Sequence, residues 1–178
     1  MVVELSSPVV NGRTLSYDVV QVGDTPTGDF DCDGNAHLFI DSVSDACARA
    51  KAGSLSLQKA NLAECDLSGA NLSNANLVLA DLNGADLNEA NLSAADLSLA
   101  KLNGANLNGA DLDVADLNGA NLTDANLNGA NLNGVILAGA NLTGANLTGA
   151  YLAGVKGWDT VKGKDEIMGL DKATGVPD

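Results

Sequence analysis

The chain has 178 residues, of which 46% are hydrophobic and only 3% aromatic, as expected for a single domain of ordinary size. Its formal net charge of −14 argues against direct binding of nucleic acid through the phosphates. No hydrophobic run is long enough to span a membrane, and no secretory signal is recognisable at the N-terminus. We therefore predict a cytoplasmic protein, or a lumenal or exported one if a targeting segment has been removed.

The N-terminal segment, residues 1–54, combines strand, loop and helix signals. Valine-rich runs on both sides of Asn11-Gly12, a strong turn signal, predict a β-hairpin within residues 2–22. Apolar residues at helical spacing predict a helix from Asp41 to Ala52, which Gly53 would end.

An acidic loop lies between these two elements. Asp29, Asp31 and Asp33 alternate with other residues and are followed by Gly34, like the opening half of an EF-hand-type calcium loop. Ile40 occupies the position where such a loop needs a bidentate glutamate. Two interpretations therefore stand, a Ca²⁺ site or an acidic surface loop, and no other cofactor is firmly implied.

A five-residue repeat occupies residues 55–154. Leucine recurs at every fifth position up to Leu152, a small residue lies two positions before each leucine, and Asn or Asp usually lies between them. In extended backbone the leucine and the small residue face one side, and the residue between them faces the other. A fixed period of this kind indicates a solenoid with leucines inside. The small residue is nearly always alanine, and the exceptions are Leu55, Cys65 and Val135.

The tandem Ala-(Asn/Asp)-Leu-x-x unit resembles the pentapeptide-repeat proteins. That resemblance implies an all-β solenoid, a right-handed quadrilateral β-helix with four pentapeptides in each coil. Open ends of a solenoid expose leucines and unpaired strand edges, so both ends need covers. We expect residues 1–54 to form an N-terminal hairpin and helix cap, and residues 155–178 to form a short C-terminal helical cap.

The C-terminal segment contains the single tryptophan of the chain. Trp158, with Ile167, Met168 and Leu170, is expected to close the end of the solenoid, with a short helix near residues 165–170. Alternatively, Trp158 marks a dimer contact, so both a monomer and a homodimer stay open.

Residues twenty apart should stack if each coil has four repeats. Stacked asparagines predict side-chain amide ladders, and stacked aspartates predict like-charge pairs that need a cation or a shifted pKa to relieve them. The expected ladders include Asn88–Asn108–Asn128 and Asn83–Asn103, the like-charge pairs are Asp66–Asp86 and Asp96–Asp116, and Asp81 is expected to pair with Lys101.

One side of the predicted rod carries apolar residues that point outward. Val78, Leu79 and Leu99 should lie close together, with Ala94 and Val114 on the adjoining face. A contiguous exposed apolar patch is typical of an interaction surface. We predict that this patch contacts an unknown protein partner or a second copy of the chain. The alternative is that these apolar residues have no function and arose by neutral substitution on a face that tolerates them.

The cysteines and the single histidine offer little catalytic chemistry. Cys65 falls at an inward repeat position and is expected to be an inert small hydrophobic residue. Cys32 and Cys47 either form a disulfide that pins the N-terminal segment or stay free thiols. His37 has no recognisable nucleophile and base around it, and a lumen full of leucine leaves no cleft for a substrate. We therefore predict that the protein is not an enzyme.

Two functions from different classes follow. The first is a non-enzymatic structural or protein-interaction module, as in many pentapeptide-repeat proteins without an assigned role. The second, also implied by the resemblance, is an acidic DNA mimic that inhibits DNA gyrase. Five coils span about 24 Å, over which duplex DNA carries about 14 charges. The repeats carry two basic and ten acidic residues, a net charge of −8. Their lower charge density favours the first function.

Overall fold

The computed structural model describes residues 4–5, 9–11, 14–16, 19–20 and 43–177, with side-chain environments for residues 46–177. The chain divides into two units, residues 1–42 and residues 43–178, and each is described by itself.

The first unit contains two antiparallel strand pairs. Strand β1 (Glu4–Leu5) pairs with β4 (Val19–Val20), and β2 (Val9–Asn11) pairs with β3 (Thr14–Ser16). This pairing confirms the predicted hairpin. Asn11 is paired with Thr14, so it belongs to the strand and not, as predicted, to the turn.

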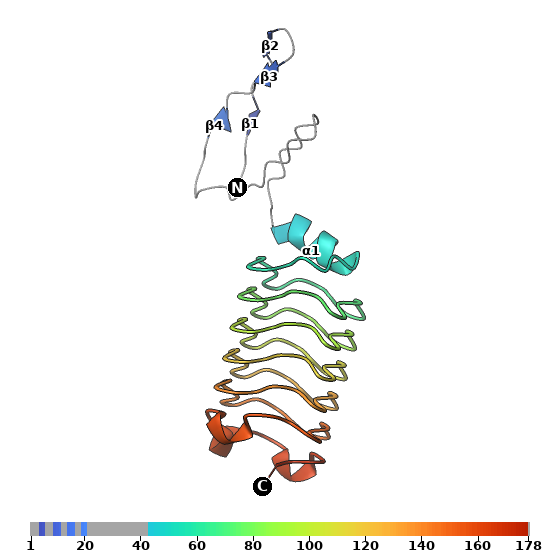
Figure 1. Cartoon of the computed structure of the whole chain (residues 1–178), viewed down its shortest axis with the longest axis vertical. Helices are drawn as coiled ribbons and strands as arrows, with labels where there is room; N and C mark the ends of the chain where they lie inside the picture. Colours follow the sequence, from blue (N-terminus) through green and yellow to red (C-terminus); the bar gives the residue numbers. More distant parts are fainter. Residues whose placement is uncertain (1–3, 6–8, 12–13, 17–18, 21–42, 178) are drawn as a thin grey trace. The chain divides into compact units, whose positions relative to one another are not determined.

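The second unit is a stack of coils that begins beneath helix α1 (Val43–Lys51) (Figure 1). Parallel bridges join each repeat to the repeat twenty residues ahead, as between Asn61 and Asp81. The Leu62 N–H donates to the Asp81 carbonyl at 2.7 Å, and the Asp81 N–H donates back to the Ala60 carbonyl at 2.9 Å. Twenty residues are four repeats of five, so each coil has four sides, and the predicted solenoid is confirmed.

The lumen of the stack is filled by leucine. Every repeat leucine from Leu57 to Leu152 is at most 1% exposed, and the alanines two positions earlier, from Ala70 onward, are at most 5% exposed. Leu55 is 52% exposed, so its predicted inward position is wrong. It precedes the first complete coil, which leaves it at the open rim without a coil to cover it.

The polar residue between alanine and leucine stabilises the turn that follows. Its side-chain oxygen accepts the backbone N–H two residues later, as Asp96 Oδ1 does from Ser98 at 3.0 Å. Asn and Asp favour such turns because the short side chain reaches its own backbone. The amide ladder prediction is partly confirmed, because Asn108 Nδ2 donates to Asn88 Oδ1 at 2.9 Å. A longer ladder runs along the bridge residues Asp86, Asn106, Asn126 and Asn146.

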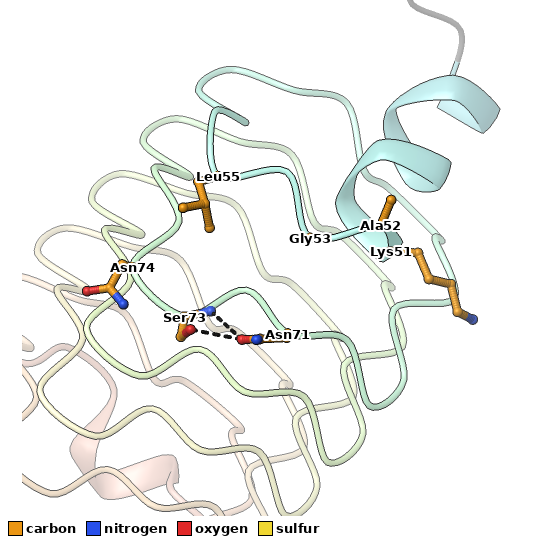
Figure 2. Close-up of a pocket in the computed structure, with 7 residues that line it drawn as sticks. All are labelled: Lys51, Ala52, Gly53, Leu55, Asn71, Ser73 and Asn74. Carbon is orange, nitrogen blue, oxygen red and sulfur yellow. Dashed lines mark hydrogen bonds between the residues drawn. The ribbon is translucent and has the colours of Figure 1, made fainter.

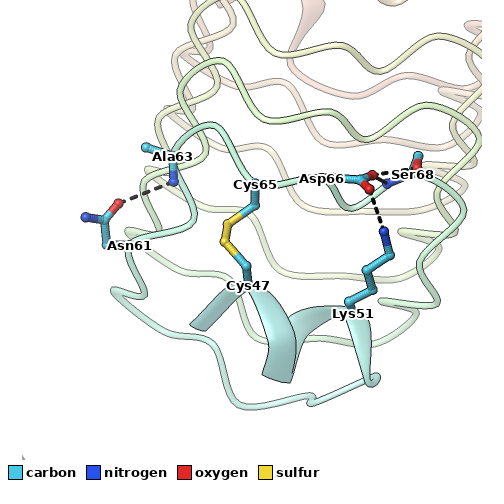
Figure 3. The surroundings of a disulfide bond; sticks show 7 residues. All are labelled: Cys47, Lys51, Asn61, Ala63, Cys65, Asp66 and Ser68. Carbon is cyan, nitrogen blue, oxygen red and sulfur yellow. Dashed lines mark hydrogen bonds and ion pairs between the residues drawn. A yellow bond between two sulfur atoms is a disulfide. The ribbon is translucent and has the colours of Figure 1, made fainter. Parts of the chain in front are cut away.

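Helix α1 confirms the predicted helix and packs on the first coil through Ala46 and Ala50, both buried. A disulfide joins Cys47 of this helix to Cys65, with the two Cα atoms 5.6 Å apart (Figure 3). The expectation that Cys65 is inert is therefore wrong, and so is the Cys32–Cys47 pairing. Cys65 replaces an inward alanine directly under α1, where its side chain meets the helix.

An ion pair reinforces the same contact. Lys51 Nζ of α1 lies 2.7 Å from Asp66 Oδ2, one residue after Cys65 (Figure 3). The hydrogen bonds from Lys51 and from the Ser68 hydroxyl hold the pKa of the Asp66 carboxyl well below its usual value. The Asp66–Asp86 stack was expected to need a cation, and Lys51 supplies it.

The C-terminal segment forms a further turn of the stack with a six-residue spacing. Residues 156, 162, 168 and 174 bridge to the preceding coil, and a glycine follows each of them where the pentapeptides have leucine. These glycines adopt φ near +70°, and a Cβ on any of them would come within 2.8 Å of the preceding coil's backbone, so a side chain does not fit. Three 3-10 helices follow them: η1 (Trp158–Thr160), η2 (Lys164–Glu166) and η3 (Leu170–Lys172).

These 3-10 helices replace the single short helix expected near residues 165–170. Trp158 is buried, as predicted, and so is Val161, which was not predicted. Ile167 and Leu170 are partly buried against the core. Met168 is 55% exposed, so its predicted place in the closure is wrong, because it is a bridge residue and those point outward.

The disulfide gives a first testable prediction. It closes a loop with a sequence separation of 18, and cross-links of that size stabilise a fold by about 3 kcal/mol. The double variant Cys47→Ala/Cys65→Ala should lower the free energy of urea unfolding by about that amount. Cys32→Ala is the matched control and should leave stability unchanged. A loss of stability with Cys32→Ala but not with Cys65→Ala would contradict the Cys47–Cys65 pairing.

Candidate functional site

Exposed aliphatic side chains occupy two neighbouring corners of the stack. Leu79 and Leu99 lie at one corner, twenty residues apart on consecutive coils, and are 44% and 55% exposed. Val114, also 55% exposed, lies at the preceding corner above Ala94. Val78 is the turn residue next to Leu79 and is partly buried. We call these two sets of residues the apolar corners.

The predicted patch already had two parts, with Ala94 and Val114 on the adjoining face, and the structure shows what lies between them. One flat side of the stack is formed by the bridge residues Ser56, Asn76, Asp96, Asp116, Ile136 and Lys156. We call the part formed by Asn76, Asp96 and Asp116 the acidic side. The turn containing Leu99 follows Asp96, and the turn containing Val114 precedes Asp116. The two apolar corners are therefore the two borders of the acidic side, which sequence reasoning did not foresee.

The backbone at these corners is strained. Leu79, Leu99 and Val114 have φ values of 60°, 59° and 53°, in the left-handed region. Glycine, which tolerates a positive φ, occupies this position in most turns after residue 100, whereas most turns before residue 100 have another residue there, such as Lys59 or Glu64. A bulky or β-branched residue there is uncommon, and such strain is of the order of 1–3 kcal/mol per residue. These side chains are therefore held outward at a cost to stability.

The following coil leaves room for these side chains. A Cβ on Gly119 would come within 2.8 Å of Leu99 Cδ2, and a Cβ on Gly134 would come within 3.0 Å of Val114 Cγ1. Leu99 and Val114 therefore lie across glycines of the next coil. The glycines let two aliphatic side chains spread along the surface.

A second candidate is a shallow pocket of about 480 Å³ where α1 leads into the first coil (Figure 2). Three of its polar side chains have partners: Ser73 Oγ donates to Asn71 Oδ1 at 2.8 Å, and Lys51 pairs with Asp66. The other lining residues are Ala52, Gly53, Leu55 and Asn74. The hydroxyl of Ser73 has no histidine or carboxylate beside it among the lining residues.

The remaining predicted site residues fall outside the part of the chain that the structure describes. This holds for Asp29, Asp31, Asp33, Cys32 and His37. Within the described residues, no group of three or more His, Cys, Asp or Glu side chains is placed to hold a metal ion. No helix in the described part has the length and apolar character needed to cross a membrane.

The repeats themselves decide the family. The family model of pentapeptide repeats, which describes 8 copies of the repeat, matches the chain in four overlapping stretches. Together these stretches run from residue 56 to residue 154, which is more than half of the chain. The chain belongs to the pentapeptide repeat family. Proteins of this family form a right-handed quadrilateral β-helix, in agreement with the four-sided stack. No curated protein matches this pentapeptide repeat protein significantly.

Solved pentapeptide repeat proteins resemble part of the chain, which spans less than two thirds of the length of two of the three described below. Rfr23 from the cyanobacterium Cyanothece 51142 is 44% identical, with 55% of this chain and 63% of that chain covered and a TM-score of 0.41. HetL from Nostoc sp. PCC 7120, involved in heterocyst differentiation regulation, is 28% identical, with 66% and 71% covered and a TM-score of 0.34. A thylakoid lumen protein of Arabidopsis thaliana is 35% identical, with 53% and 63% covered and a TM-score of 0.30.

The strain at the apolar corners gives a second prediction. Leu79→Gly and Leu99→Gly should each raise the free energy of unfolding by about 0.5–1 kcal/mol, because glycine relieves the left-handed backbone. Leu79→Ala and Leu99→Ala keep the strained conformation with a Cβ and should not raise it. Chemical denaturation of the four variants measures the difference. If the glycine variants are less stable than the alanine variants, the corners are not strained.

Proposed function

We propose that this pentapeptide repeat protein is a non-enzymatic, rigid interaction module that holds a protein partner against its apolar corners. The observation that carries the proposal is the outward placement of Leu79, Leu99 and Val114 on left-handed backbone. Glycine would be more stable at these turns in isolation, and the other non-glycine residues with positive φ in the described part are polar, charged or alanine. A role in folding does not account for large exposed aliphatic side chains at these three turns. Burial against a partner does account for them, because exposed aliphatic patches are typical of interaction sites.

The absence of enzymatic activity is part of the same proposal. The lumen is packed with leucine, so the repeats enclose no space for a substrate. In the pocket beside α1, Ser73 and Asn71 are hydrogen-bonded to each other, and Lys51 is engaged in an ion pair with Asp66. These features support a protein that acts through its outer surface.

We also propose that residues 1–54 and 155–178 cap the repeat domain at residues 55–154. Burial of Ala46 and Ala50 in α1, and of Trp158 and Val161 after the last repeat, supports this role. Such covers keep strand edges from pairing with other chains. A calcium site at Asp29, Asp31 and Asp33 stays a prediction from the sequence.

The Cys47–Cys65 disulfide bears on the location of the protein. Disulfides persist in oxidising compartments and are rare in the reducing cytosol. Of the two locations left open by the sequence, it therefore supports a lumenal or exported protein over a cytoplasmic one. A partner would then belong to the same compartment.

The gyrase-inhibitor alternative gains no support from the charge distribution. All ten acidic residues of the repeats lie between Glu64 and Asp124, and residues 125–154 carry no charge. A protein that imitates the phosphate backbone needs charge along its whole length. Residues 125–154 lack the charges that such imitation requires.

A matched capture experiment tests the proposal. Immobilised wild-type protein should retain a partner from the source extract that the double variant Leu79→Gly/Leu99→Gly loses. The variant Glu89→Gly/Asp124→Gly changes the same turn position at other corners and should retain the partner, because Glu89 and Asp124 also have positive φ. Equal retention by all three proteins, or inhibition of DNA gyrase supercoiling by the wild type, would contradict the proposal.

A further inference from the structure

The acidic side holds two stacked carboxylates between the apolar corners. Asp96 and Asp116 are joined by a parallel bridge, so their backbones are about 4.8 Å apart, the usual spacing between strands. Two like charges at that distance repel each other. Asp113, the turn residue next to Val114, adds a third carboxylate at the border of the side.

Within residues 46–177, no lysine forms an ion pair with Asp96 or Asp116, and Lys156 on the same side lies two coils beyond Asp116. The two lysine ion pairs found there lie elsewhere, between Lys51 and Asp66 and between Lys101 and Asp81. The hydrogen bonds to Asp96 and Asp116 engage only the Oδ1 atom of each carboxylate, as with the Asn118 N–H at 2.9 Å. Asp66 differs from these two residues, because its carboxylate forms an ion pair with Lys51.

The surface therefore presents negative charge framed on both borders by exposed aliphatic side chains. We infer that its occupant is a cationic amphipathic protein segment, with lysine or arginine over Asp96 and Asp116 and apolar residues against Leu99 and Val114. This inference rests on the proposed function and specifies the chemistry of the partner. A basic side chain would relieve the carboxylate repulsion while the apolar corners become buried.

Charge complementarity selects this occupant over others. The net charge of −14 attracts a basic segment over a longer range and speeds its association. The negative charge of this surface would repel an acidic protein segment, a nucleic acid or an anionic membrane. An uncharged apolar segment would cover the corners and leave the carboxylates without partners.

Three synthetic peptides separate charge from apolar contact. The first is an amphipathic helical peptide of leucine and lysine, the second has the same leucines with glutamate, and the third is oligolysine. Fluorescence anisotropy should show that wild-type protein binds the leucine–lysine peptide at least about tenfold more tightly than either of the others, since both charge and apolar contact are required. If oligolysine binds as tightly as the leucine–lysine peptide, electrostatic attraction alone explains the binding, and the inference is overturned.

Matched variants locate the binding. Asp96→Asn/Asp116→Asn keeps the Oδ1 acceptors and should weaken the leucine–lysine complex about fivefold to tenfold. Asp86→Asn/Asp111→Asn removes the same charge from other sides and should leave the affinity unchanged. Equal weakening by the two double variants would overturn the inference.

The glycine variants keep this inference distinct from the proposed function. If the leucine–glutamate peptide binds as tightly as the leucine–lysine peptide, and Leu79→Gly/Leu99→Gly abolishes both complexes, the interaction surface stands and the cationic partner is wrong. If Leu79→Gly/Leu99→Gly binds the leucine–lysine peptide like the wild type, the apolar corners take no part and both proposals fall.

Discussion

The leucine-filled lumen is the constraint on which the rest of this molecule depends. Each repeat contributes one leucine that is almost completely buried, and each buried leucine contributes roughly 1.5–3 kcal/mol through the loss of apolar surface to water. The alanine two positions earlier leaves room for these side chains. Because the backbone hydrogen bonds run between coils, a shift of one residue would turn leucine outward and Asn or Asp inward. The register of twenty residues is therefore fixed by packing.

A filled lumen leaves only the outer surface for function. Most outer positions also serve the fold, since Asn and Asp side chains accept turn N–H groups and the turns favour glycine. Nine non-glycine residues of the described part have a positive φ, and Leu79, Leu99 and Val114 are the aliphatic ones larger than alanine. They differ from the other outer residues because they expose apolar side chains and do not fill the core. The Asp96–Asp116 stack also differs from the other outer residues, because like charges face each other and neither carboxylate forms an ion pair with a lysine of the described part. These features share one side of the stack, which is why we propose that a partner binds there.

The period of leucine predicted the solenoid, because one inward residue per side follows directly from the spacing. The exposed side chains at Leu79, Leu99 and Val114 were predictable for the same reason. The disulfide was not, because the sequence shows three cysteines but not that α1 lies over Cys65. The first signal was Cys65 itself, one of few residues that replace an inward alanine. The six-residue glycine spacing from Gly157 to Gly175 was visible too, but its meaning depends on the backbone of the coil beneath it.

The most direct test of this account compares two leucines of one chain, one inside and one outside. Leu107 is 0% exposed in a central coil, and Leu99 is 55% exposed at an apolar corner. In urea unfolding, Leu107→Ala should lower the free energy of unfolding by about 3–4 kcal/mol, because it removes core contacts and leaves a cavity. Leu99→Ala should change it by no more than about 0.5 kcal/mol, as for other surface substitutions. Similar losses from the two substitutions would contradict a leucine-filled lumen with a separate outer surface.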